Sequence, residues 1–179
     1  MNLAELRNTL PDYAKDLKLN LDSVLSDTGA AGLDGNQVRA IALASAIAAR
    51  HAPLVSALEG FAAEQLSPEQ VQGAKAAAAI MAMNNIYYRA THLIHNDEYG
   101  TLRAGLRMNV MGNSGLDKIT FELASLAVSA INGCGACLDS HERVIREHDV
   151  SAQGVQSALK IAAVVHAVAV TLEQGPATA

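Results

Sequence analysis

Long apolar, alanine-rich runs separated by short polar breaks make up most of this chain, and this pattern predicts a series of helices. Two of the longer helices are expected over 38–50 and 117–131. Breaks rich in glycine, serine and asparagine or aspartate fall at 26–32 and 113–115. Because the signals of β-strands are absent, the predicted fold class is all-α.

Several segments carry the sequence signature of a helix N-terminus, in which a polar cap residue precedes Glu or Gln by three positions. They are Asn2 with Glu5, Asp34 with Gln37, and Ser67 with Gln70, where Pro68 takes the first helical position. Pro11 predicts the start of a further short helix.

The two halves of the chain show a weak internal repeat. Leu43-Ala44-Ser45 matches Leu123-Ala124-Ser125, and Ser67 with Val71-Gln72 matches Ser151 with Val155-Gln156. We place approximate half-repeats at 37–95 and 117–174 within a single domain, 1–179. A chance match between alanine-rich helices is the alternative. The cysteines belong to the second half alone, which predicts a duplicated scaffold with one chemically active copy.

Composition and charge narrow the class of protein. Residues number 179, half of them apolar, so the chain can bury a core without disulfide staples and its cysteines are free for chemistry. Charged residues make up 17% of the chain, below the roughly 25% of a typical globular protein. The surface is therefore expected to be unusually apolar, and assembly into a homo-oligomer would cover it. A net charge of −5 argues against nucleic acid or an anionic membrane as the main partner.

Targeting signals are not evident. The first residues lack the pattern of a secretory signal, and the most apolar segment, 74–83, is too short to span a bilayer. We therefore expect a cytoplasmic protein with no membrane partner. In that reducing compartment a lone CxxC motif is expected to be catalytic or metal-binding.

Cys134 and Cys137 are the only cysteines in the chain. Asn132-Gly133 ends one helix, so the next begins near Cys134 and carries Cys137 and His141 on one face. Thiols three residues apart at a helix start can close a disulfide. The positive end of the helix dipole favours a thiolate on Cys134, whereas His141, one turn beyond Cys137, is the expected base.

A carboxylate completes this predicted constellation. If the helices on either side of Gly133 form an antiparallel hairpin, His141 lies about 12 Å beyond the turn and near the level of Glu122. Glu122 occupies an otherwise apolar stretch, 121–128. We expect it to orient His141, which gives a relay from Glu122 through His141 to Cys137 and Cys134. A solvated position on the outer helix face is the alternative for Glu122.

Other interpretations of these residues remain open. Two thiolates, an imidazole and a carboxylate could surround zinc, although no second Cys or His pair supports such a site. A thioredoxin-like protein would need βαβ elements, which the chain does not predict. A helical binding module with incidental thiols would tolerate serine at both cysteines. The chain also lacks a glycine-rich fingerprint for a dinucleotide.

Together these residues resemble a known family. The pattern Glu122-x11-Cys134-x2-Cys137-x3-His141, with 129–133 before the first cysteine, is similar to the alkyl hydroperoxide reductase AhpD family. Similarity extends to 10–16, Met83-Asn84-Asn85, Tyr88-Arg89 and 106–109. The resemblance implies an all-helical protomer with duplicated halves, related to carboxymuconolactone decarboxylase-like proteins, and assembly into a homotrimer.

The resemblance also implies a function. Members are lipoyl-dependent hydroperoxide reductases that take electrons from dihydrolipoamide on a lipoylated 2-oxo acid dehydrogenase component and pass them to the peroxiredoxin AhpC. By position, Cys137 resembles the sulfenic-acid-forming cysteine and Cys134 its resolving partner, with Glu122 and His141 as the proton relay. No bound cofactor and no metal are implied. Organic hydroperoxides are the implied substrates.

One departure from the family pattern is visible. Some members have a histidine between the two cysteines, where this chain has Ala136. Direct peroxidase activity is therefore expected to be weaker, with the adaptor role dominant. The competing class is an acid-base enzyme of the decarboxylase-like relatives that acts on a small organic acid.

Overall fold

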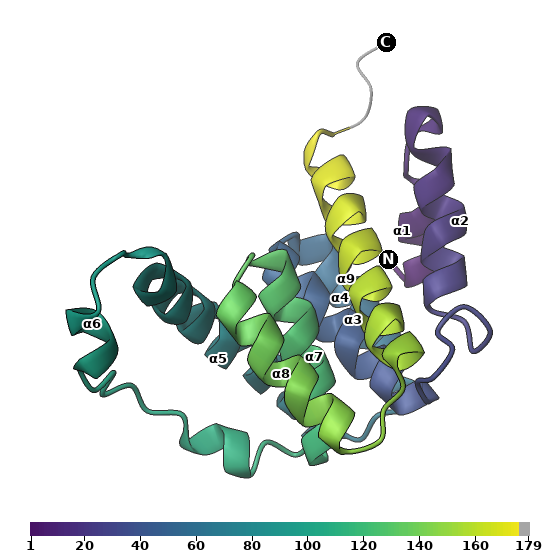
Figure 1. The fold of residues 1–179 in the computed structure, drawn as a ribbon. Helices are drawn as coiled ribbons and strands as arrows, with labels where there is room; N and C mark the ends of the chain where they lie inside the picture. The colour runs from purple at the N-terminus through teal and green to yellow at the C-terminus, as the bar shows by residue number, and fades with distance from the viewer. Residues whose placement is uncertain (176–179) are drawn as a thin grey trace.

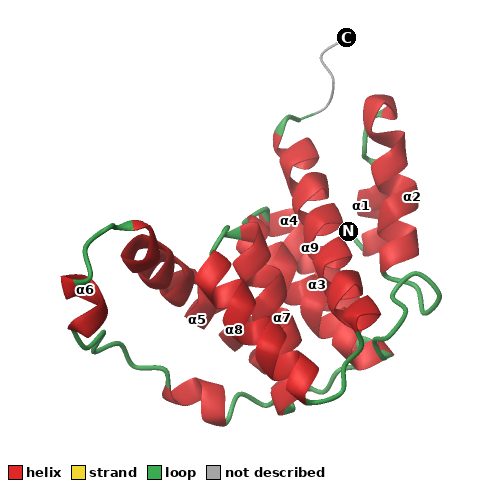
Figure 2. Ribbon diagram, viewed as in Figure 1, coloured by secondary structure: helices red, strands yellow, loops and turns green. Residues whose placement is uncertain are grey.

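The computed structural model describes residues 1–175, and all of its regular elements are helical. In chain order they are α1 (Leu3–Asn8), the 3-10 turn η1 (Asp12–Ala14), α2 (Lys15–Val24), α3 (Gly35–Ala49), α4 (Ala52–Ala63), α5 (Pro68–Leu93), α6 (Glu98–Thr101), the 3-10 turn η2 (Asn109–Gly112), α7 (Lys118–Ile131), α8 (Gly135–Glu147) and α9 (Ala152–Glu173). No strand occurs within these residues, so the prediction of an all-α fold is confirmed (Figure 2).

The polar caps set the helix starts as expected. Asn2, Asp34 and Ser67 each form a complete capping box, and Pro68 occupies the first turn of α5. Since Asp34 is the cap, α3 begins at Gly35, three residues before the predicted start. Pro11 precedes a 3-10 turn that leads directly into α2. Capping is local chemistry, which is why these boundaries could be predicted.

Two helices form the centre of the molecule. α3 packs against α4, α5, α7 and α9, and α7 in turn packs against α5, α8 and α9 (Figure 1). The middle of α3, Ala40–Ala46, is buried on every side, and so is most of α7. Alanine and serine dominate the middle of α3, and such small side chains let neighbouring helices approach closely.

α9 corrects one part of the sequence interpretation. Within residues 1–175 it is the one helix whose length and apolar composition would suffice to cross a bilayer, so the longest apolar segment is α9 and not the shorter segment 74–83. Half of its most apolar window is buried, because α9 packs against α2, α3 and α7. The buried half of this window forms part of the core.

The same order of three helices occurs twice. α3, α4 and α5 are followed by α7, α8 and α9, and Ser67 and Ser151 cap the third helix of each set. His51 caps α4 as Cys134 caps α8, and each side chain accepts a hydrogen bond from the backbone N–H three residues later. His51 and Cys134 thus hold the same capping position at the starts of α4 and α8.

The segment between α5 and α7, residues 94–117, swings out from the helical body and returns to it (Figure 1). We call this segment the arm. It carries α6 and η2. The arm returns to α5 at Gly115, whose φ of +93° is in the left-handed region and where a β-carbon would lie only 2.3 Å from the backbone carbonyl oxygen of Glu69. This return places η2 over the site described next.

Candidate active site

The turn between α7 and α8 presents the two cysteines. α7 ends at Ile131, Gly133 adopts a left-handed φ of +68°, and Cys134 is the N-cap of α8. Glycine takes this backbone conformation without steric strain. Cys134 thus lies immediately before the first helical turn, rather than inside it, and its sulfur accepts the backbone N–H of Cys137 at 3.3 Å.

Cys134 and Cys137 form a disulfide, with their α-carbons 5.3 Å apart. The two sulfurs differ in access. Cys134 is completely buried, whereas Cys137 keeps a small exposed area and lines a surface pocket. Any reagent that arrives through the pocket therefore meets the sulfur of Cys137 first.

His141 and Glu122 are in direct contact. The His141 Nδ1 atom and the Glu122 Oε2 atom lie 2.6 Å apart, and the side chains are 10% and 14% exposed, respectively. The expected hairpin of α7 and α8 produces this contact, because residues 19 positions apart meet across the turn. At such low exposure, water screens the interaction little. Glu122 therefore does not occupy the outer, solvated helix face.

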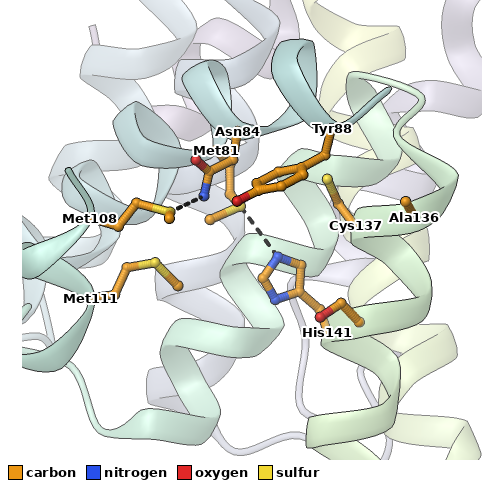
Figure 3. Close-up of a pocket in the computed structure, with 9 residues that line it drawn as sticks. Met81, Asn84, Tyr88, Met108, Met111, Ala136, Cys137 and His141 are labelled. Atoms are coloured by element: carbon orange, nitrogen blue, oxygen red, sulfur yellow. Dashed lines mark hydrogen bonds between the residues drawn. The ribbon is translucent and has the colours of Figure 1, made fainter. Parts of the chain in front are cut away.

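The pocket beside Cys137 has a volume of about 340 Å³ (Figure 3). Three elements form it: α5, the arm and α8. Its lining is Met81, Asn84 and Tyr88 from α5, Met108 and Met111 from the arm, and Ala136, Cys137, Ser140 and His141 from α8. Thioethers and aromatic carbon dominate this lining, so the pocket suits a largely apolar ligand with a small polar group.

Two contacts join α5 to the rest of the pocket. His141 Nε2 lies 3.3 Å from the sulfur of Met81, and the Asn84 side-chain amide donates to the sulfur of Met108 at 3.1 Å (Figure 3). The carbonyl oxygen of Asn84 is buried and has no hydrogen-bond partner. It is thus a buried polar atom left without a hydrogen-bond partner in the wall of the pocket.

Glu122 also lines a second hollow, of about 420 Å³, together with Lys118, Phe121 and Met111. The carboxylate therefore lies between this hollow and His141. Glu122 thus contacts His141 on one side and the second hollow on the other.

The structure brings Cys134, Cys137, His141 and Glu122 together. The opposite wall of the pocket, on α5, was given no site role from the sequence. Met81, Asn84 and Tyr88 recur on one face of α5. Their signal was available: Asn84 and Asn85 interrupt an alanine-rich apolar helix, and both are buried. Buried amides in an apolar helix need hydrogen-bond partners, so they indicate a polar site nearby.

A metal centre finds no support in this geometry. Across residues 1–175, no group of three or more His, Cys, Asp or Glu side chains is arranged to hold a metal ion. The two sulfurs of the suggested zinc set are bonded to each other, and the imidazole nitrogens face Glu122 and a thioether.

The arrangement is suited to thiol–disulfide chemistry with proton transfer. One sulfur is accessible and the other is buried directly behind it, so a group attached to the first can be displaced by the second. The imidazole lies one helical turn beyond the accessible sulfur and is held by a carboxylate, as expected for a general acid–base group.

A family model and curated proteins both match this chain. Residues 97–174 match the carboxymuconolactone decarboxylase family. "Alkyl hydroperoxide reductase AhpD" of Streptomyces coelicolor is 57% identical over 173 residues, which cover 97% of this chain and 96% of the relative. The protein of the same name from Streptomyces griseus is 56% identical with the same coverage, and that of Rhodopseudomonas palustris is 49% identical over 99% of this chain and 97% of its own length.

Proposed function

Because the chain belongs to the AhpD family of alkyl hydroperoxide reductases, we propose that it reduces organic hydroperoxides with electrons from dihydrolipoamide and also regenerates an AhpC-type peroxiredoxin. A peroxide-reducing role is supported by the relatives, which carry that name along nearly the whole chain. Our proposal adds two points to this role: dihydrolipoamide is the electron donor, and an AhpC-type peroxiredoxin is the protein partner.

A single observation carries the proposal. The accessible sulfur of Cys137 lines an apolar pocket beside His141, which is bonded to Glu122, while Cys134 lies buried behind it. The pocket can admit an alkyl hydroperoxide. The acid–base pair can supply the proton that the departing alcohol needs, and the buried thiol can close the disulfide.

In the proposed peroxide reaction, the Cys137 thiolate attacks one oxygen of the hydroperoxide and the O–O bond breaks. The other oxygen leaves as an alcohol after it takes a proton from His141, and Cys137 becomes a sulfenic acid. The Cys134 thiol then attacks the sulfenic sulfur, forming the disulfide and releasing water. Two electrons pass from the dithiol to the peroxide.

Dihydrolipoamide would restore the dithiol. One of its thiols attacks Cys137, the accessible sulfur, and forms a mixed disulfide while Cys134 leaves as a thiolate. The second thiol of dihydrolipoamide then displaces Cys137 and yields lipoamide. An oxidised AhpC-type peroxiredoxin would be reduced by the same exchange in the opposite sense. With Ala136 in place of a histidine, no second local base assists the peroxide step, which favours this adaptor role.

The lipoamide would be presented by a lipoylated 2-oxo acid dehydrogenase component. Such exchange needs a compartment that keeps thiols reduced, which supports a cytoplasmic location.

We also propose assembly into a homotrimer. Large apolar side chains are exposed along the second half of α5 and on the arm: Ile86, Leu93, Ile94, Tyr99 and Leu102, each at least 45% exposed. Exposed large apolar side chains in such number are typical of a surface that another protein covers. Light scattering coupled to size exclusion tests the proposal, and a mass of one protomer would reject it.

A coupled assay tests the catalytic proposal. We would measure NADH consumption in a mixture of this protein, lipoamide, dihydrolipoamide dehydrogenase and cumene hydroperoxide, with and without an AhpC-type peroxiredoxin. The expected result is turnover in the wild type and none in Cys137→Ser. A large gain on adding the peroxiredoxin would establish the adaptor role.

The matched control is His148→Gln, which changes a histidine at the exposed C-terminal end of α8 and leaves the pocket intact. This variant should turn over at the wild-type rate. Absence of turnover in both mixtures, with thiols shown to be reducible, would reject the proposal and direct attention to the decarboxylase-like alternative.

A further inference from the structure

A cluster of polar side chains on α5 holds the cysteine turn from behind. Asn85 is completely buried, and its amide donates to the Ser129 hydroxyl at 2.8 Å while its carbonyl oxygen accepts from the Asn132 side chain at 2.9 Å. Arg89 lies one helical turn later on α5 and donates from its guanidinium to the backbone carbonyl of Asn132. Both residues belong to the half of the chain that has no cysteine.

These bonds enclose the backbone that carries Cys134. The Cys134 N–H donates to the Ser129 carbonyl at 3.0 Å, which closes the turn. The same two turn residues, Ser129 and Asn132, are bonded through their side chains to Asn85. The position of Cys134 relative to α8 therefore depends on α5 as well as on its own turn.

The positive charge of Arg89 lies at the C-terminal end of α7. Asn132 is the C-cap of α7, where the unpaired carbonyls form the negative end of the helix dipole. The guanidinium reaches within 3.9 Å of the point where a β-carbon on Gly133 would lie, directly before Cys134. A cation there offsets the negative end of α7, and it acts together with the positive end of α8 on any thiolate in the turn.

We propose that Asn85 and Arg89 are positioning residues of the redox pair: Asn85 fixes the turn, and Arg89 stabilises the reduced, thiolate-bearing form relative to the disulfide. Residues of the first half of the chain would thus set the reduction potential of the cysteine pair in the second half. The proposal requires that the pair undergoes thiol–disulfide exchange, as in the proposed function, but it does not depend on which donor or acceptor is used.

The test is the equilibrium of the cysteine pair with reduced and oxidised dithiothreitol. Free thiols are alkylated, and the ratio of alkylated to disulfide-containing protein is measured by mass spectrometry. Arg89→Gln keeps a hydrogen-bond donor and removes the charge. We expect its equilibrium to shift about three- to tenfold toward the disulfide, since it loses a charge at a helix terminus. A tenfold shift corresponds to a reduction potential about 30 mV lower.

Companion variants separate charge from structure. Arg89→Lys keeps the charge and should remain within about twofold of the wild type. Asn85→Asp keeps the acceptor for Asn132, loses the donor to Ser129 and adds a negative charge, so it should shift further toward the disulfide than Arg89→Gln. The matched control is Arg39→Gln, because Arg39 pairs with Glu64 and stacks on Phe61 and contacts no part of the cysteine turn. Its equilibrium should not move.

An Arg89→Gln equilibrium within twofold of the wild type would overturn the inference, as would equal shifts in Arg89→Gln and Arg89→Lys. If Asn85→Asp does not fold, the two Arg89 variants decide the question alone. The measurement contains neither hydroperoxide nor lipoamide, so a failed peroxidase assay would leave this result unaffected.

Discussion

The hydrogen bond between Glu122 and His141 allows a quantitative prediction. Glu122→Gln keeps the shape of the side chain and an acceptor for Nδ1–H, but it removes the negative charge. A hydrogen bond to a charged group contributes about 1.5–3 kcal/mol, against about 0.5–1.5 kcal/mol for a neutral one. With both side chains at most 14% exposed, screening removes little of this difference.

The midpoints of these two ranges differ by about 1.2 kcal/mol, which corresponds to a roughly tenfold effect on a step that requires a protonated imidazole. We therefore expect Glu122→Gln to slow the peroxide step about tenfold, and His141→Gln to slow it about 10²- to 10⁴-fold, the usual contribution of a general acid–base group. The double variant should be no slower than His141→Gln alone, because the carboxylate acts through the imidazole.

The assay is a single turnover. Protein reduced beforehand is mixed with cumene hydroperoxide, and disulfide formation is followed by rapid quenching with an alkylating reagent. This isolates the peroxide step from the electron donor. Glu142→Gln, an exposed carboxylate on α8 paired with Arg146, is the control and should react at the wild-type rate. A Glu122→Gln protein that is folded and reacts as fast as the wild type would refute the relay.

Three further predictions follow from the same geometry. Cys134→Ser keeps a polar N-cap and the accessible thiol of Cys137. Hydroperoxide should therefore add one oxygen to Cys137 without forming a disulfide, a mass increase that mass spectrometry detects, whereas Cys137→Ser should not react. Met81→Leu conserves volume and removes the sulfur beside His141; we expect less than about 1.5 kcal/mol lost in urea unfolding and a few-fold slower peroxide step. Gly115→Ala places a β-carbon against the backbone of α5 at a left-handed φ and should lower the unfolding free energy by more than about 1 kcal/mol, measured in urea.

Each of these has a contrary outcome. Disulfide-linked dimers alone in Cys134→Ser would show that Cys137 reacts between molecules rather than in the pocket. A loss of activity of 10²-fold in Met81→Leu would assign the thioether a larger role than a contact to His141. Unchanged stability of Gly115→Ala, beside an equally stable control at the exposed and unobstructed Gly100→Ala, would mean that the arm does not need its tight return to α5.

Local features of this protein were predictable from the chain. The capping boxes at Asn2, Asp34 and Ser67 depend on contacts within one helical turn, and so the helix starts could be recognised. The contact of Glu122 with His141 was also predictable, since two antiparallel helices joined by a short turn bring residues at equal distances from it together. The half-repeat boundaries at 37–95 and 117–174 stay a prediction.

The pocket and the support of the cysteine turn depend on tertiary structure. Met81 meets His141 across 60 residues of sequence, and Asn85 meets Asn132 across 47. No helical periodicity specifies which face of α5 packs on α8, because periodicity identifies an apolar face and not its neighbour. Sequence alone determined an all-α protein with a CxxC pair at the start of a helix and a Glu122–His141 contact beside it, since each follows from short-range geometry. The packing of α5 and the arm decided which sulfur is accessible and what surrounds it, because burial depends on the long-range contacts that only the folded chain makes.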